Sequence, residues 1–494
     1  MNQNTLTRRY FLQKTSMATS ALFGLSVLQP RRAHALGSFV RKDVGKLSAS
    51  DTTLTSYAAA VAAMRQLDTT DPTNPLGWQY QAAIHGTKSP SITAEEQATW
   101  NACEHYTVFF LSWHRMYLYY FERIIRKMSG DANWALPFWN YQSTSERTLP
   151  SAFWTPADAS NPLYIFDRNP GWNDGSASLW DSAVSTAMPF GDIDFGSFYY
   201  QLEYNMHDTV HTAVGGLMGY HLTAAQDPIF FLHHSNVDRL WNSWLTLKNG
   251  RQDPFSDASW TTAPFTFFDE NKKQVTITGC EILRAQDQLG YVYEGEPAQV
   301  KEYCLNRRIR VPYYAYIPWY EVWPGPIELP AVFETKTIEV NTQPLRAHLR
   351  NSPLARMKAG SSVVLKLSQV EADHQPNIYY EVYLGIPKGE TPKFESPFYV
   401  GNLALFGGGI RDIDEQMKSH ERRLPKTAQG DRLLSFTYKI TGALQAATKA
   451  AGSLKDLDVA FVPRGALLKG RPDERHPTAT IKIGRAEIGL QRLE

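Results

Sequence analysis

The apolar positions between residues 48 and 249 recur with the spacing of helices, and three segments carry this pattern most clearly. The first, Tyr106–Lys127, is dense in apolar side chains and is followed by a glycine stop signal. The second, Tyr199–Val214, ends at two glycines, and the third opens with the cap pair Asp227-Pro228 and closes near residue 250. We therefore predict helices in these segments and loop over the Pro-, Gly- and Asn-rich stretch 149–196 between them.

Short β-branched and aromatic runs replace this pattern beyond residue 250. They are separated by turn residues and lie at 337–340, 362–367, 378–384, 398–405, 434–440, 459–462 and 479–488. Seven short runs with turns between them predict strands of a β-sandwich. The expected fold is a mainly α core, built as a four-helix bundle, followed by an all-β sandwich domain.

The chain divides into four predicted parts: an N-terminal signal over 1–35, the helical core over 36–300, a Tyr/Trp/Pro-rich linker over 301–335 and the sandwich over 336–494. The first part holds an arginine pair, a short apolar run and an Ala-x-Ala end, which together form an export signal. The arginine pair followed by Phe-Leu resembles a twin-arginine signal. We therefore expect an exported protein, periplasmic or secreted. The linker is expected to lie on the surface of the helical part.

The composition excludes several classes of protein. The chain has 50 Lys and Arg against 49 Asp and Glu, so its net charge of +1 provides no field that would hold nucleic acid. The hydrophobic fraction of 43% is typical of a globular chain, and no later segment reaches the run of about 18 apolar residues that a membrane span needs. Three cysteines are too few for a disulfide scaffold, and they leave at least one sulfur unpaired within the chain.

Histidines are concentrated in the helical part, where eight of the thirteen lie. His207 and His211 are four residues apart, so both imidazoles face one way on a helix, and His234 from the next helix would complete a three-imidazole metal site. An upstream set mirrors this one: His85, His105 and His114. Because nine residues separate the last two, we expect His105 in the loop before the helix that carries His114.

Two matched sets of three imidazoles predict two metal ions facing each other inside the bundle. No Glu-x-x-His pairs accompany them, which disfavours a di-iron carboxylate centre, and all-imidazole ligation suits zinc or copper, of which copper binds more tightly. The pair His207 and His211 alone would be explained equally well by two histidines packed in the core. The presence of two matching sets of three histidines favours a metal site. Four other histidines are interpreted as core or surface residues: His221, His348, His374 and His420.

The segment Phe109–Arg115, with the sequence FFLSWHR, resembles the first copper motif of type-3 copper proteins. The segment from His207 to Trp241, which includes DPIFFLHH, resembles the second. Residues 36–300 are therefore similar to the core of a tyrosinase or polyphenol oxidase. Tyr291-Val292-Tyr293 resembles the Tyr-x-Tyr marker that closes this core in plant, fungal and molluscan relatives.

The resemblance implies a binuclear copper centre, with His85, His105 and His114 on one ion and His207, His211 and His234 on the other. It also implies that His233 is a neighbour of the ligands and that Asp238 orients a ligand imidazole. The implied reaction uses dioxygen to convert small phenols such as tyrosine to ortho-diphenols, and then to ortho-quinones. Rival interpretations are a catechol oxidase without the first step, a hemocyanin-like oxygen carrier and a copper-scavenging protein.

Several other residues gain roles through the resemblance. Cys103 stands two residues before His105, either as an ordinary buried cysteine or as the partner of the thioether found in fungal members. Glu203 corresponds to a glutamate proposed to help deprotonate the phenol, although a solvated capping role is an alternative. At Asp208 many monophenol-hydroxylating relatives have asparagine, which puts that step in question. His221 is a candidate for the pocket entrance. The other two cysteines, Cys280 and Cys304, form a candidate disulfide.

Residues 336–494 resemble the C-terminal domains of plant polyphenol oxidases and molluscan hemocyanins, which cover the copper pocket and insert a side chain into it. The resemblance implies a latent proenzyme, activated by a protease in or near the linker, for which Arg307–Arg310 is a candidate site. Candidates for the inserted side chain are Phe406 and Phe461. The alternative is a carbohydrate-binding or purely stabilising module.

Overall fold

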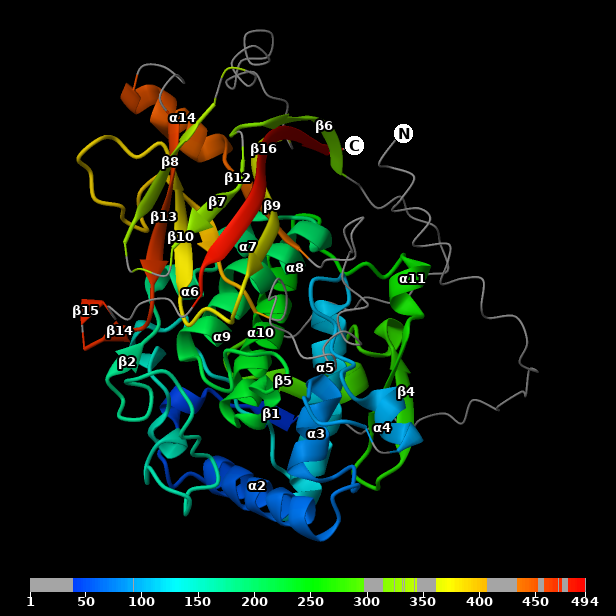
Figure 1. The fold of residues 1–494 in the computed structure, drawn as a ribbon. Coiled ribbons are helices and arrows are strands. Elements are labelled where there is room, and N and C mark those ends of the chain that lie inside the picture. The colour runs from blue at the N-terminus through cyan, green and yellow to red at the C-terminus, as the bar shows by residue number, and fades with distance from the viewer. Residues whose placement is uncertain are drawn as a thin grey trace. The chain divides into compact units, whose positions relative to one another are not determined.

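The computed structural model describes residues 39–91, 93–296, 314–323, 325–330, 332, 334–341, 343, 361–406, 433–451, 457–469, 471–472 and 479–493. Several sequence-based predictions lie outside these residues: the export signal, Arg307–Arg310, Cys304, His348 and His420. Within the described part, helices fill the region up to residue 296 and strands dominate beyond it (Figure 1). The predicted order of a helical core and a β-rich C-terminal region is therefore confirmed. The four-helix detail stays a prediction.

The helices are α2 (Thr52–Thr70), α3 (Trp78–His85), α4 (Ala94–Thr99), α5 (Phe110–Ser129), α6 (Asp181–Val184), α7 (Ala187–Gly191), α8 (Phe195–Leu202), α9 (Asp208–Val214), α10 (Ile229–Thr246), α11 (Ala258–Thr261) and α14 (Thr441–Ala451). α5 and α10 pack against each other at the centre of the core, where the rings of Phe121 and Phe231 stack with centroids 3.5 Å apart. α5 ends at Gly130, whose φ of +74° is the left-handed conformation that glycine adopts readily at a helix end. Among the described residues, no helix is long and apolar enough to cross a membrane.

The helix predicted over Tyr199–Val214 is interrupted. It consists of α8, which Asp194 caps through the backbone N–H of Ser197, then a π-helical turn over Glu203–His207 that we call η4, and then α9. π-helical turns inside α-helices are rare and occur frequently at functional sites. The periodicity of the sequence does not reveal this turn, because the apolar positions on either side still follow helical spacing.

The strands are β1 (Phe39–Arg41), β2 (Ala177–Ser178), β3 (Pro264–Phe268), β4 (Gln274–Thr278), β5 (Tyr291–Tyr293), β6 (Tyr314–Glu321), β7 (Ile327–Leu329), β8 (Lys336–Val340), β9 (Ser362–Ala372), β10 (Tyr379–Leu384), β11 (Tyr399–Leu403), β12 (Leu434–Lys439), β13 (Leu457–Arg464), β14 (Leu467–Leu468), β15 (Arg471–Pro472) and β16 (Ile481–Leu493). The C-terminal region contains a four-stranded sheet in the order β11-β10-β13-β8 and a five-stranded sheet in the order β12-β9-β16-β6. Residues of both sheets share one hydrophobic core, as in a sandwich.

Two predictions about the C-terminal region are wrong in part. The predicted linker contains β6 and β7, which both pair antiparallel with β16. β6 contains a proline, which is tolerated because β6 lies at the edge of its sheet. The sandwich is not all-β, because α14 packs against β9 and β10.

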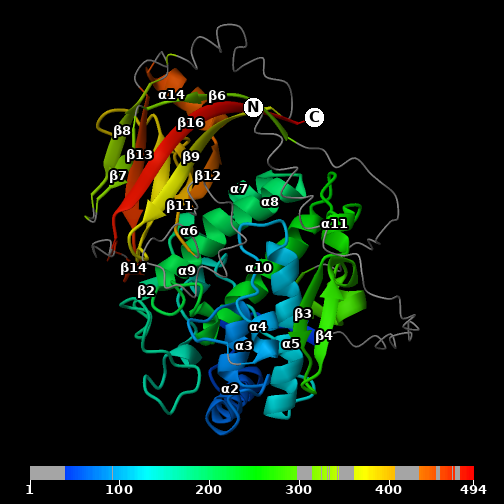
Figure 2. The same cartoon turned by 45° about the vertical axis from the view of Figure 1, so that its right-hand side comes forward.

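The helical and β-rich regions share backbone pairing: β14 pairs antiparallel with β2, so a three-stranded sheet, β15-β14-β2, contains strands from both. β11 lies against η4 and α6, and β10 lies against α9 (Figures 1 and 2). The indole N–H of Trp180 donates to the carbonyl of Gly465 at 3.1 Å. The C-terminal region is therefore attached directly to the π-helical turn that carries His207.

Candidate metal centre

Three buried histidines from different elements form the first cluster, which we call cluster A. His85 is the last residue of α3, His105 lies in the loop before α5, and His114 projects from α5. One ring nitrogen of each lies within 4.8 Å of those of the other two. The loop position of His105 is the one predicted from its spacing to His114.

The second cluster, cluster B, contains four buried imidazoles: His207, His211, His233 and His234. His207 comes from η4, His211 from α9, and the adjacent pair from α10. The Nε2 atom of His234 lies 3.3 Å from Nε2 of His207 and 3.4 Å from Nε2 of His211. These separations equal the edge of a tetrahedron with metal–nitrogen bonds of about 2.0–2.1 Å.

The two clusters face each other. The rings of His114 and His234 stack with centroids 4.3 Å apart and planes at 9°, and those of His105 and His207 are 5.5 Å apart. Burial lowers the pKa of His114 and of His211 to about 3 and holds the pKa of His234 well below its usual range. These three imidazoles therefore stay neutral at neutral pH, which is the form that binds metals.

Hydrogen bonds at Nδ1 orient most of these rings. Nδ1 of His85 lies 3.0 Å from the carbonyl oxygen of His221, Nδ1 of His114 lies 2.8 Å from that of Phe110, and Nδ1 of His211 lies 2.8 Å from that of Met218. A carbonyl oxygen can only accept, so each Nδ1 carries the proton and each Nε2 keeps its lone pair. This arrangement is typical of metal-binding histidines.

The donor set fits copper. Nε2 of His114 is buried and has no hydrogen-bond partner within the described part of the chain. Leaving such atoms unsatisfied costs about 1–3 kcal/mol each, and a cation that accepts nitrogen lone pairs removes this cost. Each cluster offers at least three imidazoles, and neither includes a carboxylate. All-imidazole sites of this kind suit copper.

Two carboxyl groups are buried beside cluster B. Glu203 Oε1 accepts from the backbone N–H of Tyr106 at 2.7 Å. Asp208 Oδ1 accepts from Nδ1 of His207 at 2.8 Å, and its Oδ2 accepts from the hydroxyl of Tyr106 at 3.2 Å. Burial, as the largest cause, raises the pKa of both carboxyl groups well above the usual range. Asp208 thus orients His207 in the way that carbonyl oxygens orient other imidazoles.

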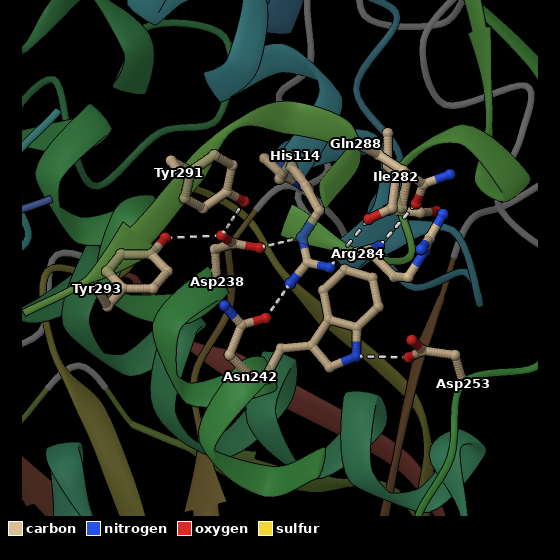
Figure 3. A network of polar contacts seen from close by, with 12 residues as sticks. His114, Asp238, Asn242, Asp253, Ile282, Arg284, Gln288, Tyr291 and Tyr293 are labelled. Carbon is tan, nitrogen blue, oxygen red and sulfur yellow. Dashed lines mark hydrogen bonds and ion pairs between the residues drawn. The ribbon is translucent and has the colours of Figure 1, made fainter. Parts of the chain in front are cut away.

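The prediction that Asp238 orients a ligand imidazole is wrong. Its carboxylate accepts from the hydroxyls of Tyr291 and Tyr293, each at 2.6 Å, and pairs with the guanidinium of Arg115 at 2.5 Å (Figure 3). A second guanidinium, of Arg41, approaches to 3.4 Å. These partners use the lone pairs of the carboxylate, and the positive charges hold the pKa of Asp238 below its usual value despite burial. Asp238 joins the Tyr-x-Tyr strand β5 to α5 and α10.

Phe406, from the C-terminal region, lies over cluster B. Its ring is fully buried and stacks on His211 with centroids 3.9 Å apart and planes at 16°. It also contacts His207 and His105 edge-on, at 5.4 and 5.6 Å. Phe461, the other predicted candidate, lies instead in the core of the sandwich.

The remaining predicted residues have clear places. Sγ of Cys103 lies 3.3 Å from Nδ1 of His105. The ring of His221 is fully buried, 6.4 Å from that of Phe406. Cys280 is disulfide-bonded. His374 is exposed on the C-terminal region, at one side of a cavity of about 530 Å³ that both regions line.

Sequence reasoning missed three residues of the site. The hydroxyl of Tyr106 contacts the carbonyl of Phe406 as well as Asp208. The hydroxyl of Tyr141 lies 3.0 Å from Nδ1 of His233. The ring of Phe230 lies 4.2 Å from that of His234. Only Phe230 had a signal, since it belongs to the quoted DPIFFLHH motif.

Two facing imidazole clusters in a helical core define a binuclear, type-3 copper centre. The comparisons agree: residues 75–195 and 167–247 match the common central domain of tyrosinase, and residues 254–309 match the polyphenol oxidase middle domain. The helical part of the chain therefore contains the central domain of tyrosinases and polyphenol oxidases. Residues 326–488 match a domain of unknown function.

Individual relatives cover parts of the chain. A tyrosinase of Hahella sp. (strain CCB-MM4) is 39% identical over 294 residues, which are 49% of this chain and 61% of that protein. A latent form of chloroplastic polyphenol oxidase from Prunus armeniaca is 31% identical over 286 residues, which are 50% of this chain and 47% of that protein. The chain thus spans about half of the length of these relatives. The solved structure of a latent aurone synthase, a polyphenol oxidase, has a TM-score of 0.60 at 20% identity over 92% of this chain and 90% of that one, which shows a shared fold.

Proposed function

We propose that the chain is a copper-dependent phenol oxidase, made in a latent form, that hydroxylates monophenols to ortho-diphenols and oxidises these to ortho-quinones with dioxygen. The observation that carries the proposal is the pair of facing, buried imidazole clusters beneath the ring of Phe406. The matched tyrosinase domain spans both clusters. The test is oxidation of a catechol to coloured quinone by the copper-loaded chain; reversible oxygen binding without turnover would indicate a carrier instead.

In this proposal cluster A holds one copper ion through His85, His105 and His114, and cluster B holds the other through His207, His211 and His234. The copper pair supplies the exchange of electrons with dioxygen and substrate. The residues around it keep the lone pairs of the ligands aimed inward, since carbonyl oxygens and Asp208 fix the Nδ1 protons. Buried aromatic rings such as Phe110 and Phe230 exclude water from the pocket.

Glu203 is the proposed proton acceptor for a bound phenol. Its Oε2 is buried and has no hydrogen-bond partner among the described residues, which leaves this oxygen available to a bound phenol. Its Oε1 is held by the backbone N–H of Tyr106. A Glu203→Gln variant should lose monophenol turnover while it retains copper, and unchanged turnover of tyrosine would contradict this role.

A catechol oxidase that does not hydroxylate monophenols is the second candidate, and Asp208 is the observation that favours it. Its carboxylate accepts hydrogen bonds from both His207 and Tyr106. It therefore orients a proposed metal ligand and also holds the tyrosine that contacts the carbonyl of Phe406. An asparagine would offer one acceptor oxygen and an NH₂ group in its place. Tyrosine supplied with a trace of diphenol distinguishes the two: quinone formation indicates a tyrosinase, and none indicates a catechol oxidase. Asp208→Asn should raise the ratio of tyrosine to catechol turnover.

We also propose a thioether between Cys103 and His105, because the sulfur already lies 3.3 Å from Nδ1 of that ring. Forming the carbon–sulfur bond would remove the thiol hydrogen and one ring-carbon hydrogen, and dioxygen would accept both, with their two electrons, as hydrogen peroxide. Mass spectrometry of a digest of copper-loaded protein should find the linked peptide two hydrogens lighter. A thiol that reacts fully with an alkylating reagent after unfolding would contradict the cross-link.

Latency is proposed to come from the C-terminal region, with Phe406 occupying the position that a substrate ring would take beside His211. The reason is steric, because a ring stacked on the imidazole at 3.9 Å leaves no room for a second ring there. Cleavage near Arg307–Arg310 by a protease is the proposed first step of activation. Export through the twin-arginine route remains the expectation for residues 1–35.

A further inference from the structure

His233 is the fourth imidazole of cluster B, beside the three proposed ligands. One of its ring nitrogens lies within 4.8 Å of a ring nitrogen of His207, of His211 and of His234. Its ring centroid is 4.8 Å from that of His211 and 5.3 Å from that of His207. The side chain is fully buried.

The hydrogen bonding of His233 is compatible with a role as ligand. Its Nδ1 lies 3.0 Å from the hydroxyl of Tyr141, and when this hydroxyl accepts the Nδ1 proton, Nε2 keeps its lone pair, as in His211 and His114. With Nδ1 engaged, Nε2 is the nitrogen left for a metal, and it has no hydrogen-bond partner among the described residues. His234 differs, because its Nδ1 has no such partner and its Nε2 faces the other two imidazoles.

A purely structural role does not account for this arrangement. A packing residue at this position would need no nitrogen, and an unsatisfied buried nitrogen costs about 1–3 kcal/mol. The hydroxyl of Tyr141 is itself fully buried and would lose its contact with His233 if an apolar side chain replaced that residue. Binding a cation through Nε2 satisfies the atom and explains the fixed ring.

We propose that His233 is an auxiliary copper ligand of cluster B, which holds the ion while it is being loaded and substitutes for a ligand that is not engaged. Any three of the four imidazoles could bind the ion. The ion would therefore stay bound when one of the four rings is not coordinated. The proposal rests on the copper centre and not on the phenol oxidase activity, and its test measures copper alone.

The experiment determines copper per folded chain after exposure to a copper(I) chelator, for the full chain and for His207→Gln, His233→Gln and the double variant. If His233 can act as a ligand, His207→Gln retains two ions and the double variant retains one, because only two imidazoles then remain in cluster B. If His233 only supports the fold, His207→Gln already retains one ion and the second substitution changes nothing. That result would overturn the proposal.

The same comparison can be made with His211→Gln, His233→Gln and their double variant. This second set keeps the test decisive if one of the first variants fails to fold. A further comparison uses Tyr141→Phe, which frees Nδ1 of His233, against Tyr57→Phe, a buried tyrosine whose hydroxyl contacts the carbonyl of Pro228. Copper release to the chelator should be about tenfold faster in Tyr141→Phe and unchanged in Tyr57→Phe. Equal release from the two variants would contradict the role assigned to Nδ1 of His233.

Discussion

Replacing Phe406 with alanine should activate the uncleaved chain. The ring is fully buried against His211 and becomes exposed when the C-terminal region leaves, so its burial favours the closed state alone. A phenylalanine ring buries about 150–250 Å², which at about 25 cal/mol per Å² is roughly 4–6 kcal/mol. Measured Phe→Ala changes in cores lie at about 3–5 kcal/mol. Taking about 3 kcal/mol as the loss, the open fraction rises by about two orders of magnitude.

The assay is oxygen uptake with a catechol, expressed per copper, for the uncleaved chain and for Phe406→Ala. Phe461→Ala provides a matched control, because Phe461 is also fully buried but lies in the core of the sandwich, away from the copper pocket. Both variants should be measured at a temperature where the near-ultraviolet circular dichroism shows the sandwich folded. Phe406→Ala should then be activated and Phe461→Ala should remain as inactive as the parent.

Two results would refute this reasoning. If Phe406→Ala binds two coppers and is no more active than the parent, the ring does not block the pocket. If Phe461→Ala is activated equally while the sandwich is folded, activation follows from general weakening of the C-terminal region, and the stacking on His211 has no special part in latency.

Three further predictions concern the surroundings of the copper site. Tyr106→Phe removes the hydroxyl that contacts the carbonyl of Phe406, and such a hydrogen bond contributes about 0.5–1.5 kcal/mol. The oxygen-uptake assay should therefore show the uncleaved variant about two- to tenfold more active than the parent. Equal activity of the two uncleaved chains would contradict this. Asp238→Asn leaves the buried guanidinium of Arg115 without its counter-ion, so thermal unfolding should show a loss of about 3–5 kcal/mol, and a loss below about 1 kcal/mol would oppose the network's assigned role. The pKa of His114 falls from 6.5 to about 3 on folding, so only the unfolded chain takes up this proton as the pH drops below 6.5. Urea unfolding of the copper-free chain should therefore show stability falling by up to about 1.4 kcal/mol per pH unit between pH 6.5 and pH 3 for this group, with a smaller slope in His114→Gln; equal slopes would contradict it.

Histidine spacing made most of the site predictable. Two imidazoles four residues apart share a face of any helix, whatever packs around it, so His207 and His211 could be paired from the sequence alone. The same holds for His105, whose distance of nine residues from His114 excluded a common helix face and placed it in a loop. The shared helix face of His207 and His211 and the loop position of His105 depend only on local backbone geometry. Spacing along the sequence is sufficient to predict such features.

The position of Phe406 over cluster B depends on contacts between distant parts of the chain. Tyr106 and Phe406 are 300 residues apart, and Asn205 and Asn402 are 197 apart, so no periodicity relates them. The φ of Tyr106, +57°, is also a conformation that a tyrosine seldom adopts and that its sequence context does not announce. Only the packing of the sandwich on η4 brings these residues together.

The attachment of the C-terminal region bears on how the proposed proenzyme opens. Asn402 donates its backbone N–H to the side-chain oxygen of Asn205 at 2.8 Å and its side-chain amide to the backbone oxygen of Asn205 at 3.0 Å. β14 pairs with β2, and Lys439 forms an ion pair with Asp192. A cut before β6 removes none of these contacts. In the proposed activation, cleavage of the chain and release of the pocket would therefore be separate steps, and a second event would have to break the contacts with η4.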